Sequence, residues 1–304
     1  MDGQIRWTNL TRREIGAHLG KRGTPAGKRV IKQLMTQNGY VKRQAQKTQT
    51  MGRRHPDRNA QFQKIAALKK EYLDAGDPVL SIDAKKKELL GNFYRDGKLF
   101  TREVQKVFDH DFPSAASGVV IPHGIFDVGR NQGHINIGTS HETSEFACES
   151  FAHWWMNQGR AIYPKARRLL ILCDGGGSNS ASRYLFKEEL QKLSDRLNLD
   201  IRMAHYPPYC SKYNPIEHRM FPHVTRACQG VIFHTVEIVK ELIAKTTTRT
   251  GLKVTVDIID KVYETGKKCV KGFKQNMRLI FDETLPKWNY RAVPTVQQPA
   301  ASKS

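Results

Sequence analysis

The chain has 304 residues, of which 39% are hydrophobic and 9% aromatic, values typical of a globular protein with one large or two ordinary domains. Its net charge of +21 favours a polyanionic partner, above all nucleic acid. No apolar run is long enough to span a membrane, and the N-terminus lacks a signal-peptide core. The five cysteines are odd in number and form no C-x-x-C pair, which argues against a disulfide framework or a zinc site and favours a reducing cytoplasm.

The first forty residues predict two short helices joined by a glycine turn. Thr11 and Glu14 form a capping box at the start of the first helix. The second helix is expected to begin at Thr24 and to end at Asn38. We therefore predict a partial helix-turn-helix-like DNA-binding segment over residues 1–40, although any basic helical hairpin shows the same pattern. Its expected DNA-contacting residues are Lys28, Arg29 and Lys32.

Residues 41–78 predict a basic linker followed by a short helix at 61–73. Few apolar residues are available there to form a core. Residues 1–78 carry 17 basic and 6 acidic side chains, so +11 of the net charge of +21 lies in this part of the chain. Such arms contact DNA phosphates, and a solvated tether has the same composition. The expected phosphate contacts are Lys42, Arg43, Arg53 and Arg54.

Three acidic residues follow patterns that indicate one site. Asp83 and Asp174 each end an apolar run that is typical of a buried strand in an α/β sheet. Chemistry in such sheets gathers beyond the carboxyl ends of strands. Glu217 follows Asn214 and Pro215, an expected helix N-cap and first helical residue, so Glu217 could instead close a capping box. Three convergent carboxylates suit Mg²⁺ or Mn²⁺.

The remaining predicted elements carry no candidate site residues. We make no structural prediction for residues 85–113. We expect Trp154 and Trp155 to belong to the core rather than to a base-stacking platform. The other predicted elements are a hairpin over 119–137, helices at 143–157, 181–197, 235–247 and 262–277, strands at 200–204 and 252–256, and a disordered tail at 295–304.

The sequence around the three acids resembles the DDE transposases. The strings at 81–88 (SIDAKKKE), 173–180 (CDGGGSNS) and 211–218 (SKYNPIEH) resemble a bacterial insertion-sequence group of the ISAzo type. They are similar, more distantly, to mariner-like elements, which also carry Asn-Pro-Ile-Glu at the third acid. The resemblance covers roughly residues 2–294. The 43 residues from Asp174 to Glu217 exceed the mariner-like spacing, and we interpret the excess as loop.

This resemblance implies an α/β, RNase H-like fold for residues 79–294, with a mixed five-stranded sheet flanked by helices. It implies that Asp83, Asp174 and Glu217 are the catalytic residues and the metal ligands of two Mg²⁺ or Mn²⁺ ions. The implied activity is DNA strand cleavage and strand transfer during transposition of a mobile element. The implied partner is double-stranded DNA, at the element ends and at the target, in a bacterial nucleoid. A homo-oligomer on DNA remains open.

Residues near the acids add expectations of their own. Lys85, Lys86 and Lys87 could meet phosphates or form a solvated face. Glycines 175–177 are expected to let Asp174 approach metal or DNA closely, with Asn179 supporting the site. No P-loop follows these glycines, so no nucleotide cofactor is expected.

Two other functions fit the same residues. One is an RNase H-like nuclease without strand transfer, and the other is an inactive transposase that only binds DNA. Members of the group usually carry more sequence before the position of Trp7. We therefore expect a truncated copy that binds DNA with little sequence preference.

Overall fold

The computed structural model describes residues 7–44, 55–176 and 183–295. The chain divides into two compact units, residues 1–51 and residues 52–304, and each is described by itself. The expected tail at 295–304, except for its first residue, and both Arg53 and Arg54 lie outside the described residues. None of the described helices combines the length and the apolar character that crossing a bilayer requires.

The first unit is a pair of helices, α1 (Arg12–Lys21) and α2 (Lys28–Gln37). The predicted capping box at Thr11 and Glu14 is present, with both of its hydrogen bonds formed. The predicted turn and helix end are also present, because Gly23 and Gly39 adopt left-handed φ angles of 77° and 75°. The second helix begins at Lys28, later than predicted.

Among the described residues, the second unit builds a nine-stranded mixed sheet in the order β7-β4-β3-β1-β5-β6-β9-β8, with β2 paired to β3. β1 runs antiparallel to β3 and parallel to β5. The central order β4-β3-β1-β5-β6 is that of the RNase H-like fold, which confirms the predicted fold class and adds four strands to the predicted five. The strands are β1 (Val79–Ala84), β2 (Glu88–Leu90), β3 (Gly118–Asp127), β4 (Gln132–Gly138), β5 (Arg168–Cys173), β6 (Asp200–His205), β7 (Lys253–Ile259), β8 (Ile280–Phe281) and β9 (Asn289–Ala292).

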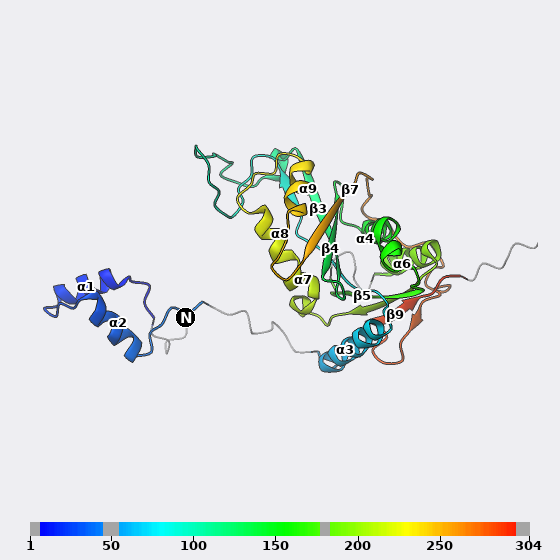
Figure 1. Ribbon diagram of the computed structural model, residues 1–304, viewed down its shortest axis with the longest axis horizontal. Coiled ribbons are helices and arrows are strands. Elements are labelled where there is room, and N and C mark those ends of the chain that lie inside the picture. The colour runs from blue at the N-terminus through cyan, green and yellow to red at the C-terminus, as the bar shows by residue number, and fades with distance from the viewer. Residues whose placement is uncertain (1–6, 45–54, 177–182, 296–304) are drawn as a thin grey trace, which may run out of the picture. The chain divides into compact units, whose positions relative to one another are not determined.

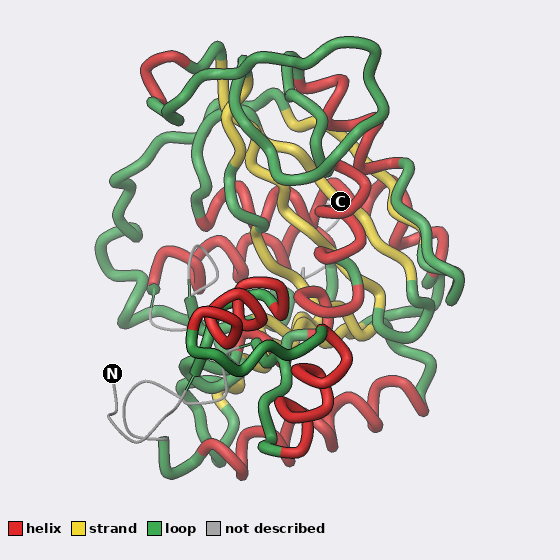
Figure 2. The backbone as a smooth tube through the Cα atoms, turned by 90° about the vertical axis from the view of Figure 1, so that its left-hand side faces the viewer, coloured by secondary structure: helices red, strands yellow, loops and turns green. Residues whose placement is uncertain are grey.

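Helices cover both faces of this sheet (Figures 1 and 2). One face packs against α4 and α6, and the other packs against α3, α7, α8 and α9. The described helices of this unit are α3 (Arg58–Asp74), α4 (Ser144–Trp154), a π-helical turn (Trp155–Gly159), α5 (Arg160–Ile162), α6 (Tyr184–Leu197), α7 (Pro215–Arg219), α8 (Phe221–Cys228) and α9 (Val236–Ala244), with short 3₁₀ helices at Pro113–Ala115 and Ser211–Tyr213.

Successive side chains of β1 point to opposite faces of the sheet, so β1 contributes to the cores on both faces. Leu80 and Ile82 lie in the core that contains Trp154 and Trp155, which confirms the tryptophan pair as core residues. Val79 faces the other way and packs in the core below α3. Asp83 is in phase with Val79, so the first acid lies on the α3 and α7 face.

One predicted helix is wrong. The described residues 262–277 contain turns and no helix. Gly266 and Gly272 adopt left-handed φ angles of 77° and 83°, which an α-helix does not allow. The Val270 amide instead donates to a carboxylate oxygen of Glu188 on α6, at 2.9 Å. The segment 262–277 is therefore a loop.

Candidate active site

The structure brings the three predicted acids to one edge of the sheet. Asp83 lies near the end of β1, Asp174 directly follows β5, and Glu217 is the third residue of α7. Because β1 and β5 run parallel, their carboxyl ends meet at the same edge. The Asp83 carboxyl group is hydrogen-bonded to Glu217, and Asp174 is near enough to act on it electrostatically. All three side chains are half-buried.

This environment changes the protonation of Asp83. Burial, then the charge of Asp174, then the hydrogen bond to Glu217 raise the pKa of Asp83 from 3.8 to about 8. The Asp83 carboxyl group therefore retains its proton at neutral pH in the metal-free protein. The Ala84 amide donates to the Oδ1 atom of Asp83 at 2.8 Å and fixes the carboxyl plane.

A buried hydrogen-bond network attaches α7 to β1 beside Asp83. The Ser81 hydroxyl donates to the Oδ1 atom of Asn214 at 2.5 Å, and Asn214 Nδ2 donates to the Ile82 carbonyl at 3.1 Å. The Ile216 amide, in the first turn of α7, donates to Ser81 Oγ at 3.0 Å. Both Ser81 and Asn214 are fully buried. The network fixes the start of the helix that carries Glu217.

The structure corrects the prediction that the Asn214 side chain caps α7. Asn214 is the N-cap residue, as predicted, but its side chain makes no capping hydrogen bond with α7. Ser81, which lies 133 residues away in sequence, accepts the first-turn N–H instead. Glu217 therefore does not close a capping box in this structure, and its carboxyl group faces Asp83. Neither Ser81 nor the true partner of Asn214 was identified from the sequence.

Gly124 allows α7 to approach the sheet. It is the register partner of Asp83 on β3. A Cβ atom at this position would lie 2.7 Å from side-chain atoms of Ile216 and Phe221. Such contacts are too short, so any side chain here would push α7, and Glu217 with it, away from Asp83.

Hydrogen bonds fix the backbone around Asp174. The amide of Gly176 donates to Asp174 Oδ1 at 3.1 Å. The Nδ1 atom of the fully buried His205 lies 3.1 Å from the Asp174 carbonyl oxygen, and its Nε2 atom lies 2.9 Å from the Tyr290 hydroxyl. Burial lowers the pKa of His205 to about 4, so the ring is neutral and donates through one nitrogen only. Asn179 lies outside the described residues.

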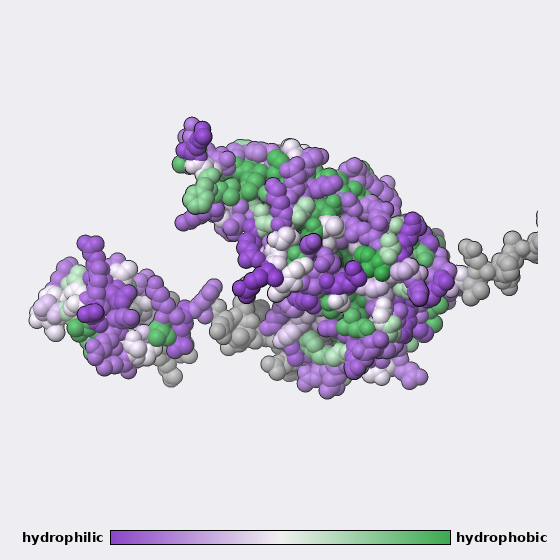
Figure 3. Space-filling view, in the orientation of Figure 1, coloured by the Kyte–Doolittle hydropathy of each residue, from purple (hydrophilic) through white to green (hydrophobic). Residues whose placement is uncertain are grey.

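The predicted DNA-contacting residues occupy two regions. In the first unit Lys28, Arg29 and Lys32 are exposed on α2, and Lys42 and Arg43 are exposed beyond it. The surface of this unit in Figure 3 is mostly hydrophilic.

In the second unit the three predicted lysines follow β1. Lys86 and Lys87 are exposed. The Lys85 Nζ atom lies 3.4 Å from the Glu88 carboxylate, so Lys85 is engaged within the protein.

Further positive charge lies next to Glu217. Burial, and then the charge of Arg219, lower the pKa of Lys69 on α3. Burial, and then Arg219 and Lys69, lower the pKa of His218, while Glu217 raises it. Because their charges shift one another's pKa values, Lys69, His218 and Arg219 lie close together, beside Glu217. Sequence analysis missed them, because nothing local to α3 indicates that it packs near α7.

The donor set of the three acids fits a hard divalent cation. All of its ligand atoms are carboxylate oxygens, which Mg²⁺ and Mn²⁺ prefer. An ion would replace the proton that Asp83 retains. The ligand atoms of the three acids are not all within 4.8 Å of one another, so the carboxyl groups would have to move closer around an ion. Among the described residues, the group that meets this separation is His134, His153 and Asp257.

Comparison with known proteins identifies the family. The family model for the Rhodopirellula transposase DDE domain matches residues 1–294. No curated protein sequence matches the chain.

Three solved structures of the Mos1 transposase are similar to the chain, and each covers 79% of it. The paired-end complex with the left transposon end is 12% identical with a TM-score of 0.44, and 72% of its chain is covered. The Mos1 mariner paired-end complex with Mn is 14% identical with a TM-score of 0.43 and 72% coverage. The Mos1 complex with Mg is 12% identical with a TM-score of 0.42 and 73% coverage.

The family match spans nearly the whole chain and includes all three acids. The resemblance to DDE transposases that the motifs indicated is thereby confirmed. The chain belongs to the Rhodopirellula transposase DDE domain family.

Proposed function

We propose that this chain cleaves DNA strands and transfers them to target DNA, with Asp83, Asp174 and Glu217 as catalytic residues that hold Mg²⁺ or Mn²⁺. The observation that supports the proposal best is the meeting of the three carboxyl groups, from β1, the end of β5 and α7, in a member of a transposase family. Each acid comes from a different element, and the buried network from Ser81 to Asn214 holds two of these elements together.

The proposed reaction has two phosphoryl-transfer steps. In cleavage, the oxygen of water bonds to a phosphorus atom at the element end and the bond from phosphorus to the 3′ oxygen breaks, which leaves a 3′-hydroxyl and a 5′-phosphate. In transfer, that 3′-hydroxyl oxygen bonds to a target phosphorus and the target's own 3′ oxygen leaves. Bound divalent ions would activate the attacking oxygen and neutralise the leaving oxygen.

The residues of this chain prepare the site for those ions. Asp83 must lose the proton that it retains at neutral pH before its oxygens can bind a cation. The positive charges of Lys69 and Arg219, with His218 beside them, lie where a phosphodiester next to Glu217 would be neutralised. The exposed Lys86 and Lys87 would extend this contact along the backbone of double-stranded DNA.

The first unit supplies a further proposed DNA contact. Lys28, Arg29 and Lys32 are exposed on one helix of a helix-turn-helix-like pair, with Lys42 and Arg43 following. In such a pair only a few side chains of the second helix contact the DNA bases, and the flanking basic residues bind phosphates.

The test uses DNA from the ends of the chain's own element. One assay follows cleavage of an end-containing duplex, and a second follows joining of a pre-cleaved end with a free 3′-hydroxyl to a plasmid. We expect Mg²⁺- or Mn²⁺-dependent activity in both, and loss of both in Asp174→Asn. The surface variant His110→Gln is the control, because His110 is exposed. Cleavage without joining would identify a nuclease, and DNA binding without either activity would identify a DNA-binding protein; each outcome contradicts the proposal.

A further inference from the structure

A second group of ligand-type side chains lies on the opposite face of the sheet from the three acids. On β4, Ile135 and Ile137 pack in the core with Ile216 of α7. The alternate residue Asn136 therefore faces α4, and its Nδ2 atom donates to the carbonyl of Ser150 there at 2.8 Å. His134 is in phase with Asn136 and shares this face.

Three side chains from three elements converge there. His134 comes from β4, His153 from the last turn of α4, and Asp257 from β7. The Asp257 Oδ2 atom lies 3.8 Å from His134 Nε2 and 3.8 Å from His153 Nδ1. One ligand atom from each residue lies within 4.8 Å of the other two.

We propose that His134, His153 and Asp257 bind a divalent transition-metal ion of the Zn²⁺ class, at a site separate from the three acids. Two imidazole nitrogens and one carboxylate oxygen are a ligand set that zinc uses, whereas Mg²⁺ prefers oxygen ligands alone. Tetrahedral bonds of about 2.0–2.2 Å would separate the ligand atoms by about 3.4 Å. The two separations from the Asp257 carboxylate, 3.8 Å each, need to shorten by a few tenths of an ångström, and one ligand nitrogen of each histidine lies within 4.8 Å of the other.

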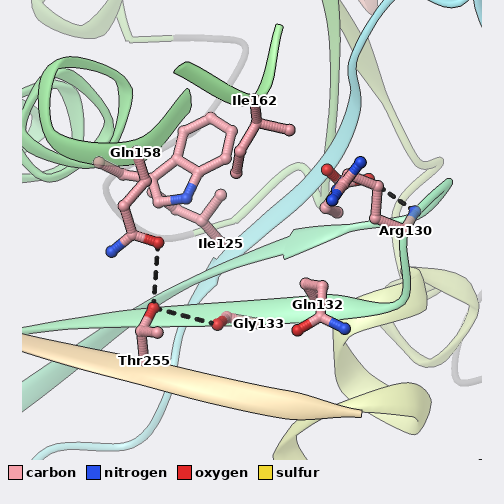
Figure 4. Close-up of a pocket in the computed structure, with 9 residues that line it drawn as sticks. Ile125, Arg130, Gln132, Gly133, Gln158, Ile162 and Thr255 are labelled. Carbon is pink, nitrogen blue, oxygen red and sulfur yellow. Dashed lines mark hydrogen bonds between the residues drawn. The ribbon is translucent and has the colours of Figure 1, made fainter. Parts of the chain in front are cut away.

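Hydrogen bonds that involve Thr255 and Gln158 orient the buried ligand His134. The His134 Nδ1 atom lies 2.7 Å from Thr255 Oγ1, and that hydroxyl donates to Gln158 Oε1 at 3.3 Å (Figure 4). Without an ion, His134 Nε2 is 3.1 Å from Asn136 Oδ1 and donates to it. When an ion binds Nε2, the ring proton moves to Nδ1, where the Thr255 oxygen accepts it, since a hydroxyl both donates and accepts.

The ion can reach this site from solvent. The His134 side chain is 1% exposed, whereas those of His153 and Asp257 are 32% and 36% exposed. One ligand is thus buried and two lie at the surface, which leaves a fourth position for water. A bound ion would tie β7, at the edge of the sheet, to β4 and to α4. The π-helical turn Trp155–Gly159 directly follows α4 and carries Gln158, which accepts the hydrogen bond from Thr255.

The test titrates Co²⁺, as a visible substitute for Zn²⁺, into the EDTA-stripped full chain in excess Mg²⁺. The excess Mg²⁺ is added to compete for sites with oxygen ligands alone, such as the three acids, because it binds nitrogen ligands poorly. We expect one equivalent of Co²⁺ to give the strong visible absorption of a tetrahedral site, and Zn²⁺ to displace it. The variants His153→Gln and Asp257→Asn should weaken Co²⁺ binding by about 100-fold or more, and Thr255→Val by roughly 10- to 100-fold.

Two control variants should bind Co²⁺ as the unaltered chain does. Asp83→Asn alters only the other site, and His110→Gln removes an exposed histidine. Circular dichroism in EDTA establishes that each variant is folded, and His153 is exposed enough for its variant to fold. An unchanged affinity in folded His153→Gln and Asp257→Asn would overturn the proposal, as would the absence of a tetrahedral spectrum at roughly millimolar Co²⁺.

Discussion

Replacing Asp83 with Asn should stabilise the metal-free protein at alkaline pH. Asp83 lies against Asp174 and Glu217, and its pKa is raised from 3.8 to about 8 by burial and by these two acids. An Asn side chain has the same shape, keeps an oxygen for the Ala84 amide, and offers an N–H to Glu217 in place of the carboxyl proton. It never has to ionise.

The magnitude follows from proton linkage. Below pH 4 Asp83 is protonated in both the folded and the unfolded protein and changes nothing. Between pH 4 and pH 8 the unfolded chain releases the proton while the folded chain retains it, so stability falls as pH rises. Above pH 8 Asp83 is ionised in both states, and the loss of unfolding free energy relative to pH 4 stays constant. A rise from 3.8 to about 8 corresponds to a loss on the order of 5 kcal/mol, at about 1.4 kcal/mol for each pH unit.

The assay is urea unfolding in EDTA from pH 5 to pH 8.5, followed by tryptophan fluorescence. The free energy of unfolding of Asp83→Asn should exceed that of the unaltered chain by several kcal/mol at pH 8.5 and approach it at pH 5. Mg²⁺ should stabilise the unaltered chain and leave the variant nearly unchanged. The exposed Asp260→Asn is the control and should not alter the pH dependence. If Asp83→Asn kept the pH slope of the unaltered chain, the three acids would not interact as described.

Three further predictions concern the placement of Glu217 and the DNA contacts. Gly124→Ala should destabilise the protein by about 1–3 kcal/mol in urea unfolding and reduce strand joining, because the new methyl group displaces α7; unchanged joining would contradict this. Asn214→Ala should cost about 1–3 kcal/mol by leaving the buried Ser81 hydroxyl without its acceptor, and an unaltered unfolding midpoint would refute the network. Deleting residues 1–51 should flatten the dependence of DNA affinity on salt, by about 0.9 in logarithmic slope for each lost phosphate contact, and an equal slope would show that this unit is only a tether.

The sequence predicted the site best where local pattern and tertiary structure agree. The apolar runs before Asp83 and Asp174 form buried parallel strands, and parallel strands bring their ends to one edge of the sheet. Pro215 starts α7, as its fixed backbone angle favours. These features depend on a few adjacent residues, so they could be identified without a structure.

Features that depend on distant residues could not be identified in this way. Local rules predicted a side-chain cap by Asn214, but Ser81 competes for the same N–H from the neighbouring strand. Helical periodicity over 262–277 was misleading because it ignores two glycines that adopt left-handed angles. The cluster of His134, His153 and Asp257 joins three elements with no shared motif, and only the register of β4 with β7 brings two of its members together.

The most direct test of the proposed function is metal-dependent joining of a pre-cleaved element end to plasmid DNA by Glu217→Gln. Glu217 is the acid for which the sequence alone offered another role, the second half of a capping box, which the structure does not form. The amide keeps the shape of the side chain but lacks the charge that a divalent ion requires. We predict that the variant is folded, binds DNA with unchanged affinity, and joins ends at least about 100-fold more slowly than the unaltered chain in Mg²⁺. Joining at the unaltered rate would contradict the assignment of the three acids as the catalytic site.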